Sequence, residues 1–218
     1  MKLFADTADL TEIETLASWG VLKGVTTNPS LLNQVEGDEV AIYRRICELV
    51  DGPISAEVVV EGRDEMIAEG RRLAAIHPNI VVKIPTSAEG LRATSVLAAD
   101  GISVNMTLCF TGPQALLAAS AGARYVSPFV GRYDDIGNNG IEALREVVET
   151  LWGFDSEVEV LAASIRNPIH VIEAAKMGAD IATVPPKVFH QMLMHPLTDV
   201  GLDKFNADAA ARRARLGG

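Results

Sequence analysis

The sequence predicts an α/β protein with the (β/α)8 TIM-barrel fold in a single domain, followed by one additional C-terminal helix. Short apolar runs alternate with longer segments that carry apolar residues at helical spacing, which favours parallel strands joined by helical crossovers. About eight such units fit into the 218 residues, and this number favours a closed barrel over an open sheet. No Gly-x-Gly-x-x-Gly motif follows the first strand, so the main signature of a dinucleotide-binding sheet is absent.

The predicted strands are short runs of branched apolar residues bounded by turn residues. Such runs are typical of strands that are buried on both faces. In chain order they cover residues 3–6, 24–27, 54–58, 80–84, 103–107, 125–127, 158–162 and 181–184.

The segments between the strands have the periodicity of amphipathic helices. They cover residues 9–19, 63–75, 88–99, 112–121, 140–152 and 168–177. Four of them lead into the next strand through Gly20, Gly101, Gly122 or Gly178, and glycine suits the left-handed residue that ends a helix. Because we find no linker and no shift in composition, residues 1–218 are expected to form one domain. Residues 198–215 are expected to form the helix beyond the barrel, which could pack on its own barrel or on a neighbouring subunit.

The net charge and the distribution of apolar residues indicate which partners and which location the protein has. The net charge of −10 argues against nucleic acid and against anionic membranes, because the overall field would repel both. No signal peptide and no apolar run of membrane-spanning length is recognised, so the expected location is the cytoplasm. Cys47 and Cys109 have neither metal-like spacing nor the number needed for a disulfide framework.

Polar side chains follow nearly every predicted strand, where the chemistry of a barrel is located. Each of them alone has an ordinary explanation as a helix cap or a turn residue. Together they predict an active site, and they are Asp6, Thr27, Asn28, Glu57, Lys83, Asn105, Thr107, Ser127, Ser164 and Arg166.

Lys83 lies inside the apolar run Ile80–Pro85, and lysine is almost never fully buried unless it is paired or functional. Glu57 ends the preceding strand. One interpretation is a structural ion pair, which would contribute little stability because both charges must be desolvated. The interpretation that we favour is a lysine whose pKa is lowered by burial, so that its neutral amine attacks a carbonyl and forms a Schiff base.

Arg132 and Arg166 follow the sixth and seventh predicted strands, and a barrel often binds phosphate near its late strands. The alternative is a pair of surface salt bridges, for instance between Arg132 and Asp134 or Asp135. None of the four histidines lies at a strand end, so neither a histidine base nor a metal site is expected.

Several motifs, taken in order along the chain, show a resemblance to a known family. They are FADTA (4–8), GVTTNPS (24–30), VKIP (82–85), NMTL (105–108), YVSPFVGR (125–132), AASIR (162–166) and HPLTD (195–199). With them the chain resembles the small-subunit transaldolase family, in the branch that includes fructose 6-phosphate aldolase. The resemblance implies a (β/α)8 barrel, Schiff-base chemistry on sugar phosphates, no metal and no organic cofactor.

The resemblance also implies roles for single residues. Lys83 matches the Schiff-base lysine, Asp6 the acid/base at the C4 hydroxyl, and Glu57 with Thr107 the pair that holds a catalytic water. The expected substrate-binding residues are Asn28, Thr27, Asn105, Ser127 and Phe129, with Arg132, Ser164 and Arg166 at the phosphate.

The family contains a transferase and a lyase, and four positions favour the transferase. Lyase members are expected to carry glutamine in place of Glu57 and tyrosine in place of Phe129, and to lack Ser127 and Asn105. The first alternative to the transferase is the lyase. The second alternative is a phosphate-binding barrel that does no Schiff-base chemistry. The resemblance further implies a homo-oligomer, a pentamer or decamer, in which the terminal helix reaches a neighbour.

Overall fold

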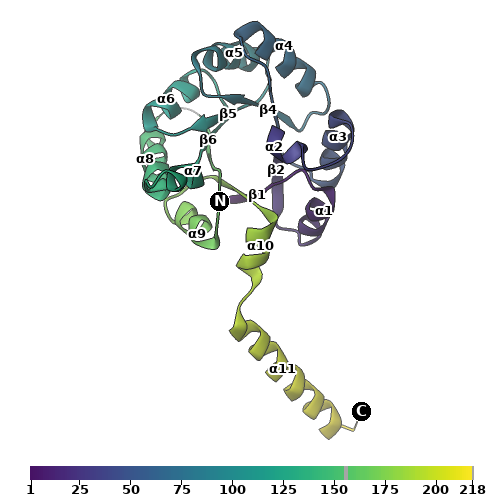
Figure 1. The fold of residues 1–218 in the computed structure, drawn as a ribbon. Helices are drawn as coiled ribbons and strands as arrows, with labels where there is room; N and C mark the ends of the chain where they lie inside the picture. Colours follow the sequence, from purple (N-terminus) through teal and green to yellow (C-terminus); the bar gives the residue numbers. More distant parts are fainter. Residues whose placement is uncertain (155–156, 218) are drawn as a thin grey trace.

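Parallel strands close into a barrel in the order in which they follow one another in the chain (Figure 1). The computed structural model describes residues 1–154 and 157–217. β1 pairs with both β2 and β8, which closes the ring. The strands are β1 (Lys2–Asp6), β2 (Leu22–Thr26), β3 (Ile54–Glu57), β4 (Ile80–Pro85), β5 (Val104–Cys109), β6 (Tyr125–Pro128), β7 (Glu159–Ala162) and β8 (Ile181–Val184). The predicted barrel and all its strands are thereby confirmed, with ends that differ by two residues at most.

Most of the helices surround this barrel, and the last one extends away from it (Figure 1). The helices are α1 (Leu10–Ser18), α2 (Pro29–Leu32), α3 (Glu39–Leu49), α4 (Arg63–Ala74), α5 (Ala88–Ala99), α6 (Gly112–Ser120), α7 (Val130–Asp135), α8 (Gly140–Trp152), α9 (Pro168–Lys176), α10 (Pro186–Leu193) and α11 (Pro196–Arg215). The six crossover helices and the terminal helix of the sequence prediction are all present. The prediction omitted α2, α3, α7 and α10.

The glycines predicted to end helices have the left-handed backbone that this position requires. Their φ angles are 76° at Gly20, 78° at Gly101, 90° at Gly122 and 87° at Gly178. A side chain at such a φ would be strained, so glycine ends the helix and turns the chain towards the next strand.

The interior of the barrel has an apolar layer beneath a polar one. Phe4, Val81, Tyr125, Leu161 and Ile181 pack together in a cluster separate from the larger core. Successive side chains of a strand point to opposite faces, so the residue two positions further on shares the inward face. That residue is Asp6 after Phe4, Lys83 after Val81, and Thr183 after Ile181. The alternation therefore carries polar groups to the carboxyl end of the barrel.

α11 projects away from the barrel (Figure 1), and none of its described side chains is buried. Leu197, Val200 and Phe205 are all more than 60% exposed. Within the described residues, no helix is both long and apolar enough to cross a membrane. α11 thus presents apolar side chains that its own barrel does not cover.

Candidate active site

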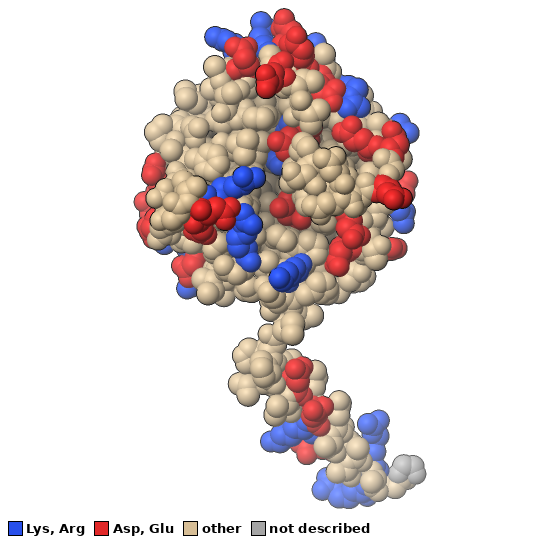
Figure 2. Space-filling model, viewed as in Figure 1, with Lys and Arg blue, Asp and Glu red and all other residues tan. Residues whose placement is uncertain are grey.

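A cavity of about 220 Å³ opens at the carboxyl end of the barrel. Lysine or arginine and acidic side chains both border this central depression (Figure 2). Eight of the residues predicted from the sequence line it: Asp6, Asn28, Lys83, Ser127, Phe129, Arg132, Ser164 and Arg166. The remaining four, Thr27, Glu57, Asn105 and Thr107, lie on β3, on β5 or directly after β2.

Lys83 is buried, with 4% of its surface exposed, yet its side chain lines the cavity. Its Nζ lies 2.9 Å from Glu57 Oε2 and donates a hydrogen bond of 3.1 Å to the backbone carbonyl of Thr27. The register of β3 and β4 pairs Glu57 directly with Lys83. The carboxylate beside the amine can therefore accept its proton, as a Schiff-base lysine requires.

Asp6 lies in the cavity wall at the end of β1, partly exposed to the cavity. Thr26 Oγ1 donates a hydrogen bond of 2.8 Å to Asp6 Oδ1. Desolvation by burial raises the pKa of Asp6 above its ordinary value, against the opposing effects of the Lys83 charge and the Thr26 hydroxyl. A carboxyl group with a raised pKa is suited to exchange protons with a substrate hydroxyl.

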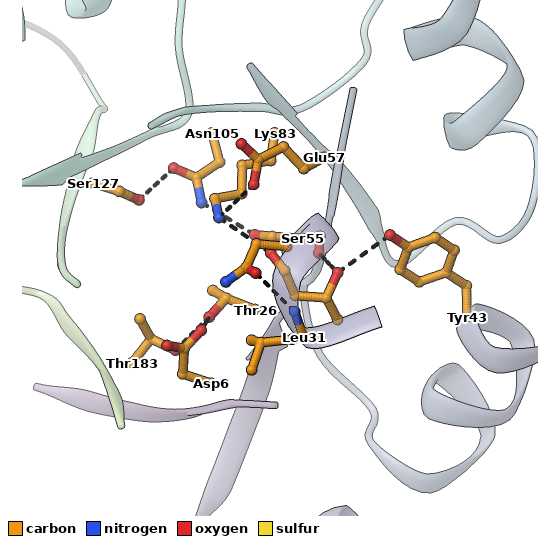
Figure 3. Close-up of polar contacts among 12 residues, drawn as sticks. Asp6, Thr26, Leu31, Tyr43, Ser55, Glu57, Lys83, Asn105, Ser127 and Thr183 are labelled. Carbon is orange, nitrogen blue, oxygen red and sulfur yellow. Dashed lines mark hydrogen bonds and ion pairs between the residues drawn. The ribbon is translucent and has the colours of Figure 1, made fainter. Parts of the chain in front are cut away.

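A buried polar network supports Lys83 from the side of α3 (Figure 3). The Thr27 hydroxyl donates to the backbone carbonyl of Ser55 at 2.9 Å and lies 3.2 Å from the Tyr43 hydroxyl. Burial raises the pKa of Tyr43 to about 12, so this hydroxyl stays protonated. Thr27 consequently offers Lys83 its backbone carbonyl, while its side chain holds that carbonyl in place.

A second network crosses the floor of the site through β3, β5 and β6. Ser127 Oγ donates to Asn105 Oδ1 at 2.6 Å, and Asn105 Nδ2 donates to Ser55 Oγ at 3.1 Å. Asn105 is fully buried, so these bonds fix its amide orientation. Thr107 Oγ1 is also buried, and within the described chain no hydrogen-bond partner is found for it.

The start of α7 and the loop after β7 bring Arg132 and Arg166 to one rim of the cavity. Val130 N donates to Ala163 O at 3.0 Å, and Gly131 N donates to Ser164 O at 2.9 Å. Arg166 forms an exposed ion pair of 2.9 Å with Asp135. Arg166 therefore has the surface salt bridge that was the alternative to a phosphate site. Among the described residues, the Arg132 guanidinium has neither a hydrogen bond nor an ion pair, so the alternative bridges from Arg132 to Asp134 or Asp135 are not found.

His170 stands behind this rim and is buried. Its Nδ1 accepts a hydrogen bond from the backbone N–H of Arg166, and its Nε2 lies 3.3 Å from Asp134. Burial lowers its pKa, partly offset by Asp134. The described residues contain no group of three or more His, Cys, Asp or Glu side chains arranged to hold a metal ion.

Four polar residues of the site were not predicted from the sequence: Thr26, Tyr43, Ser55 and Thr183. Thr26 and Thr183 line the cavity, whereas Tyr43 and Ser55 support it from behind. Ser55 and Thr183 lie inside their strands, whereas the site was predicted from residues at the strand ends. The signal that drew attention to Lys83, a polar residue within an apolar strand, also applies to Thr183.

Nearly the whole chain matches one family. The model of the transaldolase/fructose-6-phosphate aldolase family matches residues 3–216. The chain belongs to this family. Membership confirms the resemblance drawn from the sequence motifs, and it joins the barrel and its buried lysine to a family of enzymes.

Proteins named probable transaldolase from several organisms are similar to the chain over most of its length. A probable transaldolase of Thermus thermophilus is 58% identical over 95% of this chain and 97% of its own. One of Caldicellulosiruptor saccharolyticus is 57% identical over 95% of this chain and 96% of its own. A probable transaldolase of Symbiobacterium thermophilum is 54% identical over 99% of this chain and 100% of its own length.

Proposed function

We propose that the protein is a transaldolase that transfers a dihydroxyacetone unit from a ketose phosphate to an aldose phosphate through a Schiff base on Lys83. The observation that carries the proposal is the buried Lys83 amine, which lines the cavity 2.9 Å from Glu57. The names of the similar bacterial proteins agree with it. Fructose 6-phosphate or sedoheptulose 7-phosphate would be the donor, in the non-oxidative pentose phosphate pathway.

In the proposed mechanism, Lys83 begins the reaction. Glu57 takes a proton from the amine, which then adds to the ketone carbon. Glu57 returns this proton to the carbinolamine hydroxyl, which leaves as water and gives an iminium. Glu57 and the Thr107 hydroxyl, which has no hydrogen-bond partner among the described residues, are suited to hold the water that this step moves. The iminium then acts as the electron sink for the carbon–carbon cleavage.

Asp6 is the proposed acid/base of the cleavage step. Its carboxylate removes the proton of the C4 hydroxyl, the C3–C4 bond breaks, and the aldehyde phosphate leaves. The three-carbon unit stays on Lys83 as an enamine, which attacks the incoming aldose phosphate while Asp6 returns the proton. Asn28 and Ser127 in the cavity wall, with Thr27 and Asn105 behind them and Phe129 beside them, would orient the substrate hydroxyls.

Arg132, Ser164 and Arg166 form the proposed phosphate site. A phosphate between the guanidinium groups would accept charge-assisted hydrogen bonds from both. Arg166 is held by Asp135 at an exposed position, where an ion pair contributes at most about 1 kcal/mol, so phosphate can compete for it. Arg132 has no such partner among the described residues to give up.

The proposal favours transfer over simple release of dihydroxyacetone. Glu57, Phe129, Ser127 and Asn105 all stand as expected for the transferase. Glu57 contacts Lys83, and Ser127 donates a hydrogen bond to Asn105. These contacts would control how water reaches the enamine on Lys83. A slow hydrolysis of the enamine leaves time for an acceptor to bind.

The deciding experiment measures glyceraldehyde 3-phosphate release from fructose 6-phosphate, with and without erythrose 4-phosphate. A transaldolase releases at most one equivalent per active site without the acceptor, and with the acceptor it releases glyceraldehyde 3-phosphate continuously and forms sedoheptulose 7-phosphate. Equal release without the acceptor, with free dihydroxyacetone, would identify the lyase instead.

Borohydride trapping tests the chemistry common to both activities. With fructose 6-phosphate, we expect a reduced three-carbon adduct on Lys83 by mass spectrometry and none in Lys83→Met. An unmodified wild-type lysine would exclude both Schiff-base activities and leave the phosphate-binding barrel.

We also propose a homo-oligomer, a pentamer or decamer, in which α11 contacts a neighbouring subunit. The exposed apolar side chains of α11 support this assembly. The proposed location is the cytoplasm, where the sugar phosphates of central metabolism are held.

A further inference from the structure

Two threonine hydroxyls connect Asp6 to the strand that closes the barrel (Figure 3). Thr26 on β2 donates to Asp6 Oδ1 at 2.8 Å, and its Oγ1 lies 2.6 Å from Oγ1 of Thr183 on β8. Both threonines are 2% exposed and both line the cavity. Three adjacent strands, β8, β1 and β2, therefore contribute one short chain of polar groups.

The number of hydroxyl protons sets the direction of this chain. A carboxylate only accepts hydrogen bonds, and a threonine hydroxyl has one proton to donate. When Thr26 gives its proton to Asp6, the 2.6 Å contact requires Thr183 to donate to Thr26. In this direction both hydroxyl protons are used. Hydrogen bonds to an ionised acceptor are about twice as strong as neutral ones, so the chain favours the carboxylate.

We propose that Thr26 and Thr183 are positioning residues that keep Asp6 ionised and hold its carboxylate in a fixed orientation. The inference rests on the proposed function, in which Asp6 acts as the base. With Oδ1 held by Thr26, Oδ2 is left for the substrate hydroxyl. Thr183 acts through Thr26, which its own hydrogen bond polarises.

The groups around Asp6 have opposing effects on its pKa, so the loss of one hydrogen bond can change its ionisation. Burial raises the pKa of Asp6, and so does the nearby Glu57 carboxylate, whereas Lys83 and Arg166 lower it. The Thr26 hydroxyl also lowers it. Removing this bond leaves desolvation less opposed, so the Asp6 pKa should rise and the base should lose its ionised form at a higher pH.

The test compares the pH profile of kcat/KM in the wild type, Thr26→Val and Thr183→Val. Valine keeps the shape of threonine and removes the hydroxyl. We expect the acidic limb of Thr26→Val to move up by about one pH unit, the worth of one hydrogen bond to a charged group. Thr183→Val should move it in the same direction by less, and Thr183→Ser should restore it. The value of kcat should fall while KM changes little.

Thr94→Val is the matched control. Thr94 is also fully buried, on α5, and its hydroxyl donates to the sulfur of Met106 at 2.8 Å. The variant loses a buried threonine hydroxyl without touching Asp6, so its pH profile should coincide with that of the wild type. A shift equal to that of Thr183→Val would overturn the inference, because any buried hydroxyl would then have the same effect.

A second readout does not depend on turnover. The carboxyl carbon of Asp6 is titrated by NMR in the full-length protein labelled with ¹³C-aspartate, and its signal is identified with Asp6→Asn. We expect a higher Asp6 pKa in both valine variants, and an unchanged titration in both would overturn the inference. If Thr26→Val does not fold, Thr183→Val decides alone, since it keeps the Thr26–Asp6 bond. A shifted titration without any trapped Lys83 adduct would refute the proposed function and leave the positioning role intact.

Discussion

Lys83 and Asp6, the two charged side chains on the strands that line the cavity, each lie close to a group that compensates them. Lys83 contacts Glu57 and the Thr27 carbonyl, and Asp6 accepts a hydrogen bond from Thr26. An isolated buried charge costs several kcal/mol, so these partners make the site compatible with a folded barrel. The compensation is incomplete at Asp6, whose pKa stays raised by burial.

Asp6→Asn is expected to stabilise the protein at neutral pH while it removes activity. The folded-state pKa of Asp6 is raised above 3.8, so folding favours its protonated form. The wild type therefore loses stability as the pH rises from that value through the folded-state pKa, and asparagine avoids this loss. Chemical denaturation at neutral and acidic pH measures the difference, which should disappear at acidic pH. Turnover should fall by about 100-fold or more.

Asp51→Asn is the control for this prediction, since Asp51 is exposed between α3 and β3, away from α11. It should change neither stability nor turnover. A variant Asp6→Asn that is less stable than the wild type at neutral pH would show that the Lys83 charge outweighs desolvation.

At the scale of elements, the phosphate rim depends on two loops that touch closely. The backbone hydrogen bonds from Val130 and Gly131 join the start of α7 to the loop after β7. A Cβ atom on Gly131 would lie 2.4 Å from Arg166 Nε and 2.4 Å from the Ser164 carbonyl oxygen. Only glycine therefore lets α7 and the Arg166 loop lie side by side.

Gly131→Ala should weaken phosphate recognition more than the Schiff-base step. The added methyl group displaces Arg166, so the KM for a phosphorylated acceptor should rise by about tenfold, the loss of one hydrogen bond to a charged group. Borohydride trapping of dihydroxyacetone, which has no phosphate, should be unaffected. Steady-state kinetics with phosphorylated and unphosphorylated aldehydes measures the contrast.

Gly153→Ala is the matched control, because a Cβ atom there meets nothing within 4 Å and Gly153 lies at the end of α8, away from α11. Its KM values should equal those of the wild type. An unchanged KM in Gly131→Ala would mean that Arg166 does not bind the phosphate.

At the scale of the whole molecule, the barrel and α11 differ in how their side chains are covered. The barrel has a continuous core between its strands and its ring of helices, whereas the described part of α11 has no buried side chain. A helix whose apolar side chains stay exposed to water gains little hydrophobic stabilisation from the fold of its own chain. Contact with another subunit would provide the missing burial.

Removing residues 196–218 should therefore reduce the assembly and leave the barrel folded. Multi-angle light scattering should show an oligomer for the full chain and a smaller species for the truncated one. Circular dichroism and borohydride trapping should still report a folded barrel with a reactive Lys83. A monomeric full-length protein would contradict the proposed assembly.

Local patterns in the sequence determined the fold and much of the site. The alternation of apolar runs and amphipathic segments predicted the barrel, because strand and helix periodicities are properties of neighbouring residues. The positions after the strands predicted Lys83, Asp6 and the arginines, because parallel strands end at one edge of the barrel. The short helices α2 and α7 were missed, since they lie in loops where few residues carry a periodic signal.

Only the tertiary structure decided which polar groups meet. Thr26 and Thr183 are 157 residues apart in the chain and come within 2.6 Å only because β8 pairs with β1 beside β2. The choice of Asp135 as the partner of Arg166, and the absence of a partner for Arg132 in the described chain, likewise depend on how the loops pack. The sequence gives the type of each residue, but barrel closure and strand register determine which side chains come within a few ångströms of one another.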